Sequence, residues 1–590
     1  MKKKIQNHSF HIPVMGIGYT VDTPIKVAQY GISSVISLVD DVLMEKMREV
    51  YSLKFDMPFF SISDKINDFR AKRITAYLNM VNKIVEKKSL GIKNSIKEKS
   101  KEYEKYIELL PAFSDIKEKI EDFLKNYDFF KENKNFLNFS TGSIDVNIMT
   151  KLDKKNFCKG KELEDKYNDA HSALRGFANS ELNSSLVLSA GMNTKLYSYL
   201  EKFEDFYPKK DNSFKKKIIL KVSDYRSALI QGKFLAKKGL WISEYRIESG
   251  LNCGGHAFAT EGYLIGPILE EFKENKKFLI QTNYEIFCNS LKEKKLFVPE
   301  KKYCNIRITA QGGVGTTKEH NFLMKHYKLD SIGWGTPFML VPEAISIDEN
   351  TCKLLGKSEE KDLYMSEISP LGVLFNNLKN NTKDIEKINN IKKNKIGSVC
   401  TNKYLVSNTE FTKKPICTAS RQYQILKIKE LEDKNLNAED YKKSYNKIVN
   451  KSCICVGLST STLLVNSLDT NKIGEGVSVC PGPNMAYFSE IVSLKKMINH
   501  IYGKINLISK NNRPNMFLKE LEMYVDYFKN KIEETSHPIA KKQSKYFKKF
   551  YKNLNNGIEY YKNKFSDFKE NMEKDLEKFK NEIYKENLKI

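Results

Sequence analysis

The chain has 590 residues, 41% of them hydrophobic, and a formal net charge of +26. A single core rarely serves a chain of this length, so we expect about two to four domains. It contains no run of about 18 apolar residues, which argues against a transmembrane helix. The basic N-terminus lacks the apolar segment and small-residue cleavage site of a signal peptide. We therefore expect a cytoplasmic protein with no membrane partner.

The positive charge comes almost entirely from lysine. Of the 99 basic residues nine are Arg, against 73 acidic residues. Arg is the preferred bidentate ligand of phosphates and guanine, so a chain poor in Arg is a weak candidate for nucleic-acid recognition. Lys and Asn have AT-rich codons, and codon bias explains their abundance more simply. We expect a small-molecule substrate and no specific nucleic-acid partner.

The N-terminal segment predicts a strand-helix-strand unit. A short strand from Ile12 to Met15 runs into a loop with Gly16 and Gly18. A helix begins near Pro24, and the β-branched run from Ile32 to Val39 predicts a second strand. This order is typical of the start of a parallel α/β fold.

Strands and helices then alternate as far as residue 345, with one interruption. Residues from about 62 to 135 are charged and carry apolar residues at helical spacing, which predicts an insertion of amphipathic helices outside the barrel. Further strands are predicted at Ser143–Thr150, Ser185–Ala190, Lys217–Val222, Trp241–Ile247, Ile306–Ala310 and Leu329–Ile332. The alternation predicts an α/β fold, a parallel (β/α)8 TIM barrel over residues 1–345.

Glycine-rich turns follow the last two predicted strands. A helix-like run from Thr317 to Tyr327 separates them. Glycines let backbone N–H groups approach a phosphate, and a helix N-terminus adds partial positive charge. In eight-stranded α/β barrels a phosphate site commonly follows strands seven and eight. The pattern predicts a phosphate cradle formed by Gly312, Gly313, Gly315, Gly333, Gly335 and Thr336.

The remainder of the chain predicts two further regions. Residues 346–510 form a Cys-containing α+β extension, and residues 511–590 form a long, basic, amphipathic helical tail. The tail suggests one or two long helices, with a hairpin break near Asn555–Gly557. Aromatic residues among its lysines could stack on bases, but at helical spacing we favour a seam between helices.

Four segments, each at a strand end and in the same order, resemble one known family. They read IPVMGIG…TP…VAQYGISSVIS, SIDVNIM, IILKV…CGGH and TAQGGVG…LDSIGWGTPFMLVPEA. The chain resembles the flavin-dependent nitronate monooxygenase (2-nitropropane dioxygenase-like) family over roughly residues 10–60 and 140–345. The same type of barrel includes flavin-dependent enoyl-acyl-carrier-protein reductases, so the resemblance points to a cofactor more than to a substrate.

The resemblance implies FMN at the carboxyl face of the barrel, with its phosphate on the glycine turns. Met15, Gly16 and Asn147 would then lie near the isoalloxazine. Lys221 would place a positive charge near the reducible ring, which stabilises reduced flavin. A salt bridge at the barrel rim is an equally good interpretation of Lys221.

The loop carrying Gly254, Gly255 and His256 is the predicted catalytic element. The glycine pair would let the loop pass close to a ligand, and His256 would act as acid or base because imidazole titrates near neutral pH. The alternative is a hydrogen-bonded loop histidine. We place His8 and His11 in an N-terminal arm and regard them as weaker candidates. Two departures from the family, Cys253 and the bulky Trp334, leave the substrate open.

Five cysteines fall in the C-terminal extension, and two interpretations of them stay open. Their thiolates could bind an iron–sulfur cluster or zinc. However, the sequence has no CxxC pair here, and several of these cysteines lie in apolar runs where a free thiol is often simply buried, the interpretation we favour. The residues are Cys400, Cys417, Cys453, Cys455 and Cys480.

The function predicted from the sequence is an FMN-dependent oxidoreductase of the nitronate monooxygenase-like class. It would act on a small carbon acid or an enoyl-type substrate. The alternative is a non-catalytic barrel that serves as a scaffold. In either case the helical insertion or the tail offers a surface for a second copy of the chain or a protein partner.

Overall fold

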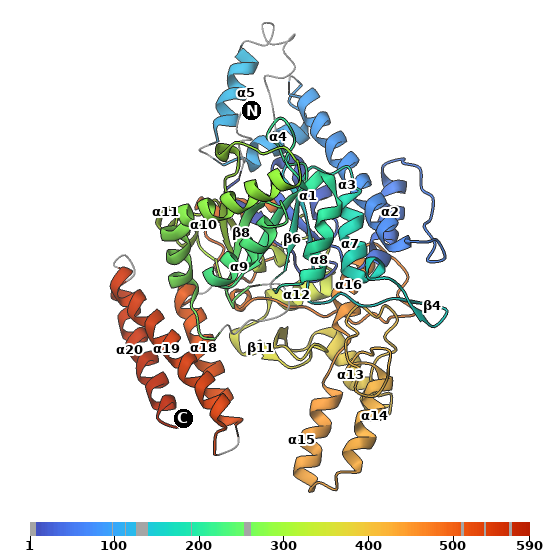
Figure 1. The fold of residues 1–590 in the computed structure, drawn as a ribbon, viewed down its shortest axis with the longest axis vertical. Coiled ribbons are helices and arrows are strands. Elements are labelled where there is room, and N and C mark those ends of the chain that lie inside the picture. The colour runs from blue at the N-terminus through green and yellow to red at the C-terminus, as the bar shows by residue number, and fades with distance from the viewer. Residues whose placement is uncertain are drawn as a thin grey trace.

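A closed barrel of eight parallel strands lies at the centre of the chain (Figure 1). The computed structural model describes residues 8–96, 98–111, 114–125, 140–189, 191–252, 261–508, 512–535, 538–565 and 569–590. Around the barrel the strands follow the order β1-β10-β9-β8-β7-β6-β3-β2, and β1 pairs with β2 to close it. The strands are β1 (Phe10–Ile12), β2 (Ser33–Ser37), β3 (Ile144–Ile148), β6 (Ser185–Leu188), β7 (Lys217–Val222), β8 (Ile242–Glu248), β9 (Arg307–Gln311) and β10 (Ser331–Gly333).

This topology confirms the predicted parallel (β/α)8 barrel. Two strand positions differ from the prediction by a few residues. The first strand is Phe10–Ile12 rather than Ile12–Met15, because its register is set by pairing of His11 with Gly333 and with Ser33. The last strand is correspondingly Ser331–Gly333. The sequence pattern located the strands, and the pairing between neighbours set their ends.

Helices form the outer ring of the barrel. Each lies between two consecutive strands or follows one, as parallel connections require. They are α1 (Thr23–Val27), α2 (Asp41–Lys54), α3 (Phe69–Asn94), α7 (Asp169–Ala178), α8 (Thr194–Tyr199), α9 (Tyr225–Ala236), α10 (Ile265–Glu293) and α11 (Thr317–His326). A two-stranded sheet of β4 (Phe157–Cys158) and β5 (Lys161–Glu162) lies outside the barrel.

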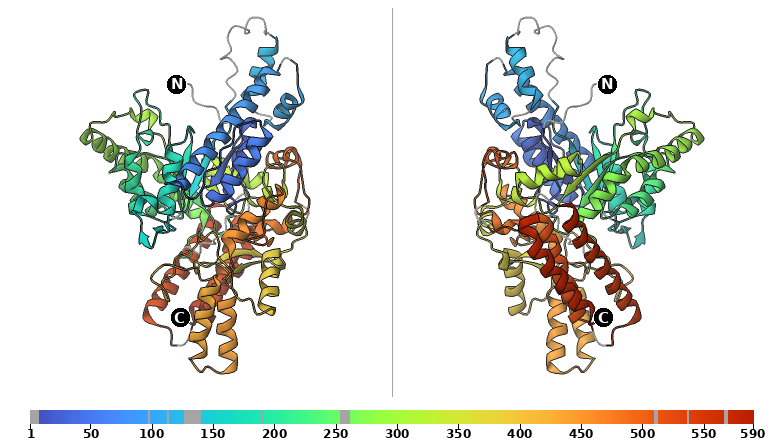
Figure 2. Two further views of the ribbon diagram at one scale, coloured as in Figure 1. Left: turned by 90° about the vertical axis from the view of Figure 1, so that its right-hand side faces the viewer. Right: turned by 90° about the vertical axis from the view of Figure 1, so that its left-hand side faces the viewer.

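The predicted insertion is helical, but its first helix belongs to the ring. Helix α3 packs tightly against α7, since a Cβ at Gly176 would come within 2.8 Å of the Ile74 side chain. Thr75 also donates a hydrogen bond to the Gly176 carbonyl. Helices α4 (Lys101–Leu109) and α5 (Asp115–Lys125) follow α3 at the upper end of the molecule (Figures 1 and 2).

The barrel interior has an apolar layer and a polar layer. Val35, Val187 and Ile219 form a small separate core inside the barrel. The neighbouring layer is polar, with the Arg246 guanidinium paired with the Glu244 carboxylate at 2.7 Å and both side chains 4% exposed. Paired charges of this kind keep a polar barrel interior from carrying unmatched buried charge.

The extension after the barrel covers the carboxyl ends of the strands (Figures 1 and 2). The Gly18 amide donates to the Leu458 carbonyl at 3.0 Å, and the Tyr19 hydroxyl donates to the Ser478 carbonyl at 2.7 Å. Its elements are α12 (Glu349–Gly356), β11 (Leu363–Ser366), β12 (Phe375–Leu378), α13 (Thr382–Lys392), α14 (Arg421–Glu432), α15 (Ala438–Val449), α16 (Ile454–Val465) and α17 (Leu494–Ile501).

The described part of the tail contains three helices, one more than the one or two expected: α18 (Met516–Glu533), α19 (Lys541–Lys564) and α20 (Lys569–Asn587). Their aromatic residues form the seam expected from the spacing: the Phe528 and Phe550 rings stack with centroids 5.3 Å apart. The predicted break near Asn555–Gly557 is wrong, because α19 continues through it. Gly557 instead allows close packing on the barrel, where a Cβ would come within 2.6 Å of Leu264.

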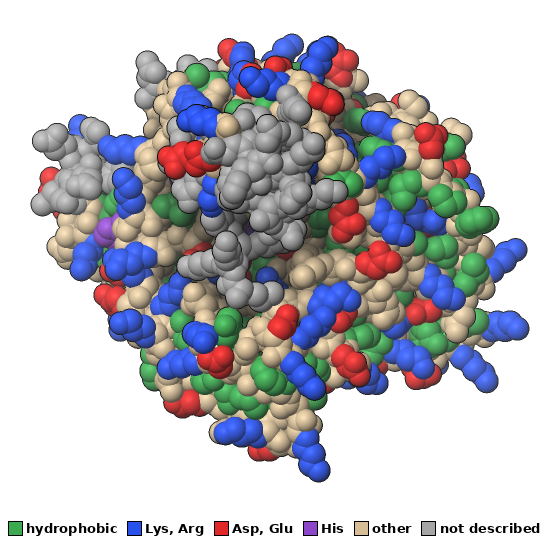
Figure 3. Space-filling view, turned by 90° about the horizontal axis from the view of Figure 1, so that it is seen from above, with side chains coloured by type: hydrophobic (Ala, Val, Ile, Leu, Met, Phe, Trp, Pro, Cys, Tyr) green, Lys and Arg blue, Asp and Glu red, His purple; other side chains and the backbone are tan. Residues whose placement is uncertain are grey.

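Two surface properties bear on partners. Among the described residues no single helix is long and apolar enough to span a membrane, and only α15 and α16 pass that test, as a pair bent by 45°. On the face of the molecule seen in Figure 3, basic and acidic side chains are interspersed rather than separated into patches. This face therefore shows no continuous basic patch of the kind that binds a polyanion.

Candidate functional site

The centre of the barrel mouth carries a buried polar cluster built on one carboxylate. Glu248, at the end of β8, accepts hydrogen bonds at Oε1 from Lys221 Nζ at 2.9 Å and from Gln311 Nε2 at 2.7 Å. Asn252 Nδ2 donates to the same oxygen at 2.7 Å. The strand ends of β7, β8 and β9 therefore meet in one charged network.

The rim salt bridge that we considered for Lys221 is present. The Lys221 and Glu248 side chains are 12% and 6% exposed, so the pair is largely desolvated. Desolvation strengthens an ion pair's interaction but makes an unmatched partner costly. Lys221 is thus held as a fixed positive charge at the carboxyl end of β7.

Asn147 supplies an acceptor at the same level of the barrel. Its side chain is 4% exposed at the end of β3, and its Oδ1 has no hydrogen-bond partner among the described residues. Buried polar atoms are nearly always satisfied by protein, water or ligand. Asn147 therefore offers a site for an N–H or O–H group at the mouth.

His11 lies inside the barrel, and its placement in an N-terminal arm is wrong. The imidazole sits on β1, 3% exposed, with Nδ1 3.1 Å from Ser331 Oγ. Burial, reinforced by the nearby Arg246 charge, lowers the pKa of His11 well below its usual value, so the ring is neutral near pH 7. The alternation of Phe10 and Ile12 around it was the sequence signal for an inward-facing position.

The first glycine turn is filled by the protein's own groups. Gly312 and Gly313 have φ values of +108° and +84°, which only glycine adopts readily. The Gly315 and Thr316 amides both donate to Glu319 Oε2, at 2.9 and 3.2 Å, completing a capping box at the N-terminus of α11. Of the amides predicted to hold a phosphate, that of Gly315 is therefore bonded to a carboxylate.

Arg513, from the start of the tail, covers that carboxylate. Its Nη1 lies 2.7 Å from Glu319 Oε1, and the two side chains are 6% and 2% exposed. Its Nη2 donates to the Gly313 carbonyl at 2.8 Å, and its Nε donates to Asn484 Oδ1 at 2.9 Å. A Cβ on Gly315 would be 2.8 Å from the guanidinium. The Glu319–Arg513 pair occupies the cradle.

The second turn is also covered by the extension. Thr336 Oγ1 accepts a hydrogen bond from the Gly482 amide at 3.1 Å. Gly333 makes room inside the barrel, since a Cβ there would lie 2.6 Å from the Gln311 side chain. The bulk of Trp334 does not crowd the turn, because its buried indole turns to His320 and donates to Nδ1 at 3.1 Å.

Met15 and Gly16 lie at the mouth, beneath helix α16. Met15 is fully buried, and Gly16 has a φ of +55°. A Cβ at Gly16 would be 2.8 Å from the Tyr19 ring and 3.3 Å from Leu458 of α16. Gly254, Gly255 and His256, together with Cys253, lie outside the described residues.

The polar groups at the mouth and those at the glycine turns differ in how well they fit FMN, the first facing its isoalloxazine ring and the second its phosphate. Lys221, Gln311 and Asn147 provide the mixture of donors, acceptors and charge that the polar edge of an isoalloxazine takes. At the first glycine turn Glu319 holds the Gly315 and Thr316 amides and is itself paired with Arg513, so a phosphate could bond to these two amides only if Glu319 moved away from them.

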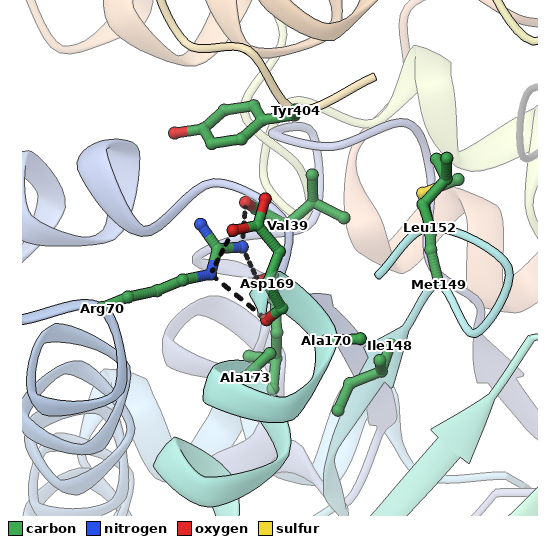
Figure 4. Close-up of a pocket in the computed structure, with 10 residues that line it drawn as sticks. Val39, Arg70, Ile148, Met149, Leu152, Asp169, Ala170, Ala173 and Tyr404 are labelled. Carbon is green, nitrogen blue, oxygen red and sulfur yellow. Dashed lines mark hydrogen bonds and ion pairs between the residues drawn. The ribbon is translucent and has the colours of Figure 1, made fainter. Parts of the chain in front are cut away.

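Two cavities among the described residues lie outside this cluster. One of about 20 Å³ lies beside the ends of β2 and β3, where Arg70 pairs with Asp41 at 2.6 Å and approaches Asp169 (Figure 4). Tyr404 of the extension also lines it. This volume holds about one water molecule and no cofactor. A larger open hollow of about 660 Å³ lies within the extension, between Asp348 and Glu386.

No protein-family model and no curated protein sequence matches the chain. Among solved structures it is similar to FabK from Thermotoga maritima, at 12% identity over 88% of this chain and 96% of that one, with a TM-score of 0.36. It is also similar to the enoyl reductase domain of MlnA, from the macrolactin biosynthesis cluster of Bacillus amyloliquefaciens. That match has 12% identity over 89% of this chain and 96% of the other, with a TM-score of 0.38. At these scores the barrel assignment stands on the strand order itself.

Proposed function

We propose that this protein is an FMN-dependent oxidoreductase of the parallel-barrel class, acting on a small carbon acid, such as a nitronate, or on an enoyl-type substrate. The observation that carries the proposal is the buried cluster of Lys221, Glu248 and Gln311 at the carboxyl ends of consecutive strands. Active sites of (β/α)8 barrels lie at that face, and buried charged groups in such a position are candidates for a functional site.

In this proposal a bound flavin supplies the hydride chemistry. The chain's own contribution is to fix charge and polarity at the mouth. Lys221 is held in place by Glu248, and Asn147 Oδ1, which has no hydrogen-bond partner among the described residues, can accept one. Helix α16 and Tyr19 pack over Gly16 at the mouth, and in this proposal they would shield the flavin from water. His256 remains the proposed proton donor or acceptor on the loop after β8.

The direct test is the ligand that copurifies with the full chain. We expect about one FMN per chain, released on denaturation and identified by its absorbance and by mass spectrometry. A colourless protein that takes up no FMN during dialysis would remove the proposal. If flavin is bound, His256→Ala should abolish turnover and leave the flavin in place. Loss of flavin in this variant would make His256 a structural residue.

A second candidate, a non-catalytic barrel, is favoured by one observation. Arg513 and Asn484, from the chain's last third, bond to the first glycine turn and to Glu319. A scaffold would keep this arrangement permanently, and the tail or the α4–α5 insertion would then bind a protein partner or a second copy.

Glu319→Gln separates the two candidates. It removes the negative charge from the cradle and frees the Arg513 guanidinium for an anion. If the pair is a reversible occupant of a phosphate site, the affinity for FMN should rise about tenfold or more, and inorganic phosphate should compete. In a scaffold the substitution changes stability alone. Leu323→Val, a conservative change on the inner face of the same helix, is the matched control.

A further inference from the structure

Three buried polar atoms on the barrel strands have no hydrogen-bond partner among the described residues. They are His11 Nε2 on β1, Gln311 Oε1 on β9 and Asn147 Oδ1 on β3. The three residues are between 1% and 4% exposed, so bulk water does not reach them freely. Buried polar groups are nearly always bonded to protein, ordered water or a ligand. Each atom thus leaves a hydrogen-bonding position open, and the first two border the same space.

His11 and Gln311 stand on one level of the barrel, on either side of Gly333. The register pairs Gly333 with His11 on one side and with Gln311 on the other. Gln311 is paired in turn with Glu248 of the mouth cluster. Gly333, Gln311 and Glu248 are each the last residue of their strand. The level is therefore the carboxyl end of the barrel, where the active sites of this fold lie.

Gly333 leaves a gap between the two side chains, because it has no Cβ. A Cβ at this position would lie 3.1 Å from His11 Nε2 and 3.3 Å from Gln311 Oε1. It would also come within 2.6 Å of Gln311 Cβ, so no larger residue fits there without displacing Gln311. The two polar atoms face the same gap and do not hydrogen-bond to each other.

The mouth cluster fixes which atom of the Gln311 amide faces the gap. Gln311 Nε2 donates to Glu248 Oε1 at 2.7 Å, and Lys221 Nζ donates to the same oxygen. The opposite orientation would set the amide oxygen against a carboxylate and lose this bond. Oε1 is therefore the atom left beside Gly333, where it can only accept. Donation to a carboxylate polarises the amide and makes this oxygen a stronger acceptor.

The His11 imidazole is a neutral hydrogen-bonding group at the same gap. Its Nδ1 lies 3.1 Å from Ser331 Oγ, which uses one of the two ring nitrogens. Burial and the Arg246 charge hold the pKa of His11 well below its usual value, and the nearby Gln311 side chain offsets only part of this lowering. If the Ser331 hydroxyl donates to Nδ1, Nε2 carries the hydrogen and is a donor.

We propose that His11 is a ligand-contacting residue of the barrel mouth, whose Nε2 binds, together with Gln311 Oε1, the uncharged polar edge of the flavin ring. The pair offers a donor beside an acceptor, and both groups are neutral. An imide edge, in which an N–H stands next to a C=O, is the complement of that pattern, and the oxidised isoalloxazine has such an edge. The inference rests on the proposed function and adds a residue to its site.

Two substitutions of His11 separate contact with a ligand from contact with Ser331. An Asn amide reaches about as far as the Nδ1 position, so His11→Asn keeps the bond to Ser331 and loses the group at Nε2. The longer Gln amide reaches the Nε2 position, so His11→Gln keeps a hydrogen-bonding group at the gap. The affinity of the full chain for FMN, measured by fluorescence quenching, should fall about tenfold in His11→Asn and less than about threefold in His11→Gln.

His8→Asn is the matched control. His8 is as deeply buried as His11, but both of its nitrogens have partners in the protein, the Tyr502 hydroxyl and the Tyr30 carbonyl. This substitution should lower the unfolding free energy and leave the affinity for FMN unchanged. Denaturant unfolding of each variant without flavin measures the cost to the fold separately from the cost to binding.

A flavin methylated at the imide nitrogen tests the same contact without any change to the protein. The native chain should bind this analogue at least about tenfold more weakly than FMN, because the methyl group removes the N–H that Gln311 Oε1 would accept. This comparison remains decisive even where a substitution of His11 prevents folding.

The outcomes distinguish this inference from the proposed function. If the native chain binds FMN, equal affinity in His11→Asn or for the methylated flavin overturns the contact and leaves the flavin site in place. The gap at Gly333 would then hold an ordered water. Weaker binding in His11→Gln than in His11→Asn would show that the imidazole acts through Ser331, which also contradicts the contact. A native chain that takes up no FMN overturns the proposed function and this inference with it.

Discussion

The mouth cluster and the glycine turns are the two ends of the predicted flavin site. They differ in which part of the chain supplies their hydrogen-bond partners. The centre of the mouth is built from barrel residues, and one of its acceptors, Asn147 Oδ1, has no partner among the described residues. At the glycine turns Glu319 of the barrel is joined by Arg513, Asn484 and Gly482, which all lie beyond the barrel. The first end is thus built by the barrel alone, and the second is an interface between the barrel and the regions that follow it. The same motif can therefore hold a cofactor or hold a domain.

Breaking the Glu319–Arg513 ion pair should lower the unfolding free energy more than any other change considered below. Arg513→Met leaves the Glu319 carboxylate buried without its partner and should cost about 3–5 kcal/mol of unfolding free energy. Denaturant unfolding measures this, with Arg421→Met on the exposed face of α14 as the control. The double variant Glu319→Gln/Arg513→Met should recover part of the loss. A cost no larger than that of the control would show that the turn is not held by this pair.

A second contact between tail and barrel should depend on pH. Glu520 of α18 is 1% exposed and accepts from Ser249 Oγ at 2.7 Å and from the Ile265 amide at 2.8 Å. Burial raises its pKa from 4.5 to about 7. Because the folded pKa is the higher one, the protonated form contributes stability below pH 4.5, and this is lost as the pH rises through 7.

The size of that effect is about 3 kcal/mol, from the shift in pKa. Unfolding free energies measured between pH 4.5 and 8 should fall along this curve in the native chain, and the Glu520→Gln variant should lack that component. Hydrogen exchange should locate the change in α18 and at the start of α10. An unchanged pH profile in the variant would mean that Glu520 titrates normally.

Which parts of the fold and of the candidate site could be predicted from the sequence depends on how far apart in the chain the interacting residues lie. Strand-helix alternation is local, so the barrel and nearly all its strands were found. The cluster at the mouth was found in part: Lys221 and Asn147 end strands, whereas Glu248 was missed because only the pairing of β7 with β8 brings it to Lys221. Arg513 lies about 200 residues from its glycine turn. No local pattern connects the two.

The arrangement of the cysteines in the extension likewise could not be predicted from local sequence patterns. The spacing of Cys400 and Cys417 matches no short metal motif, and the sequence favoured simple burial. Cys400 and Cys417 lie in one small buried cluster with Val406 and Ala419, and only the fold of the loop between them brings the two together. Likewise His11 was set aside as part of an arm because a three-residue strand leaves little pattern to detect.

A substitution of Lys221 tests the mouth cluster, at the opposite end of the predicted flavin site from the glycine turns. Lys221→Met should reduce FMN affinity by about tenfold, or about 1.4 kcal/mol, since it removes the one fixed cation of the mouth cluster. Lys276→Met is the control, because its salt bridge to Asp330 lies on the outer helix α10, away from the mouth. Titration with FMN followed by fluorescence quenching measures both. Equal affinity in the two variants would assign Lys221 to stability alone.

The smallest expected effect is at the second turn. Thr336→Val removes the hydroxyl that accepts from the Gly482 amide and leaves that donor buried, which should cost about 1 kcal/mol. Thr336→Ser keeps the hydroxyl and should cost less than half as much, although it also loses the methyl group. If FMN phosphate instead displaces Gly482 from this turn, the cost of Thr336→Val should shrink in the flavin-loaded protein and FMN affinity should change. Comparing unfolding with and without FMN therefore distinguishes a turn committed to the extension from one that exchanges it for a cofactor.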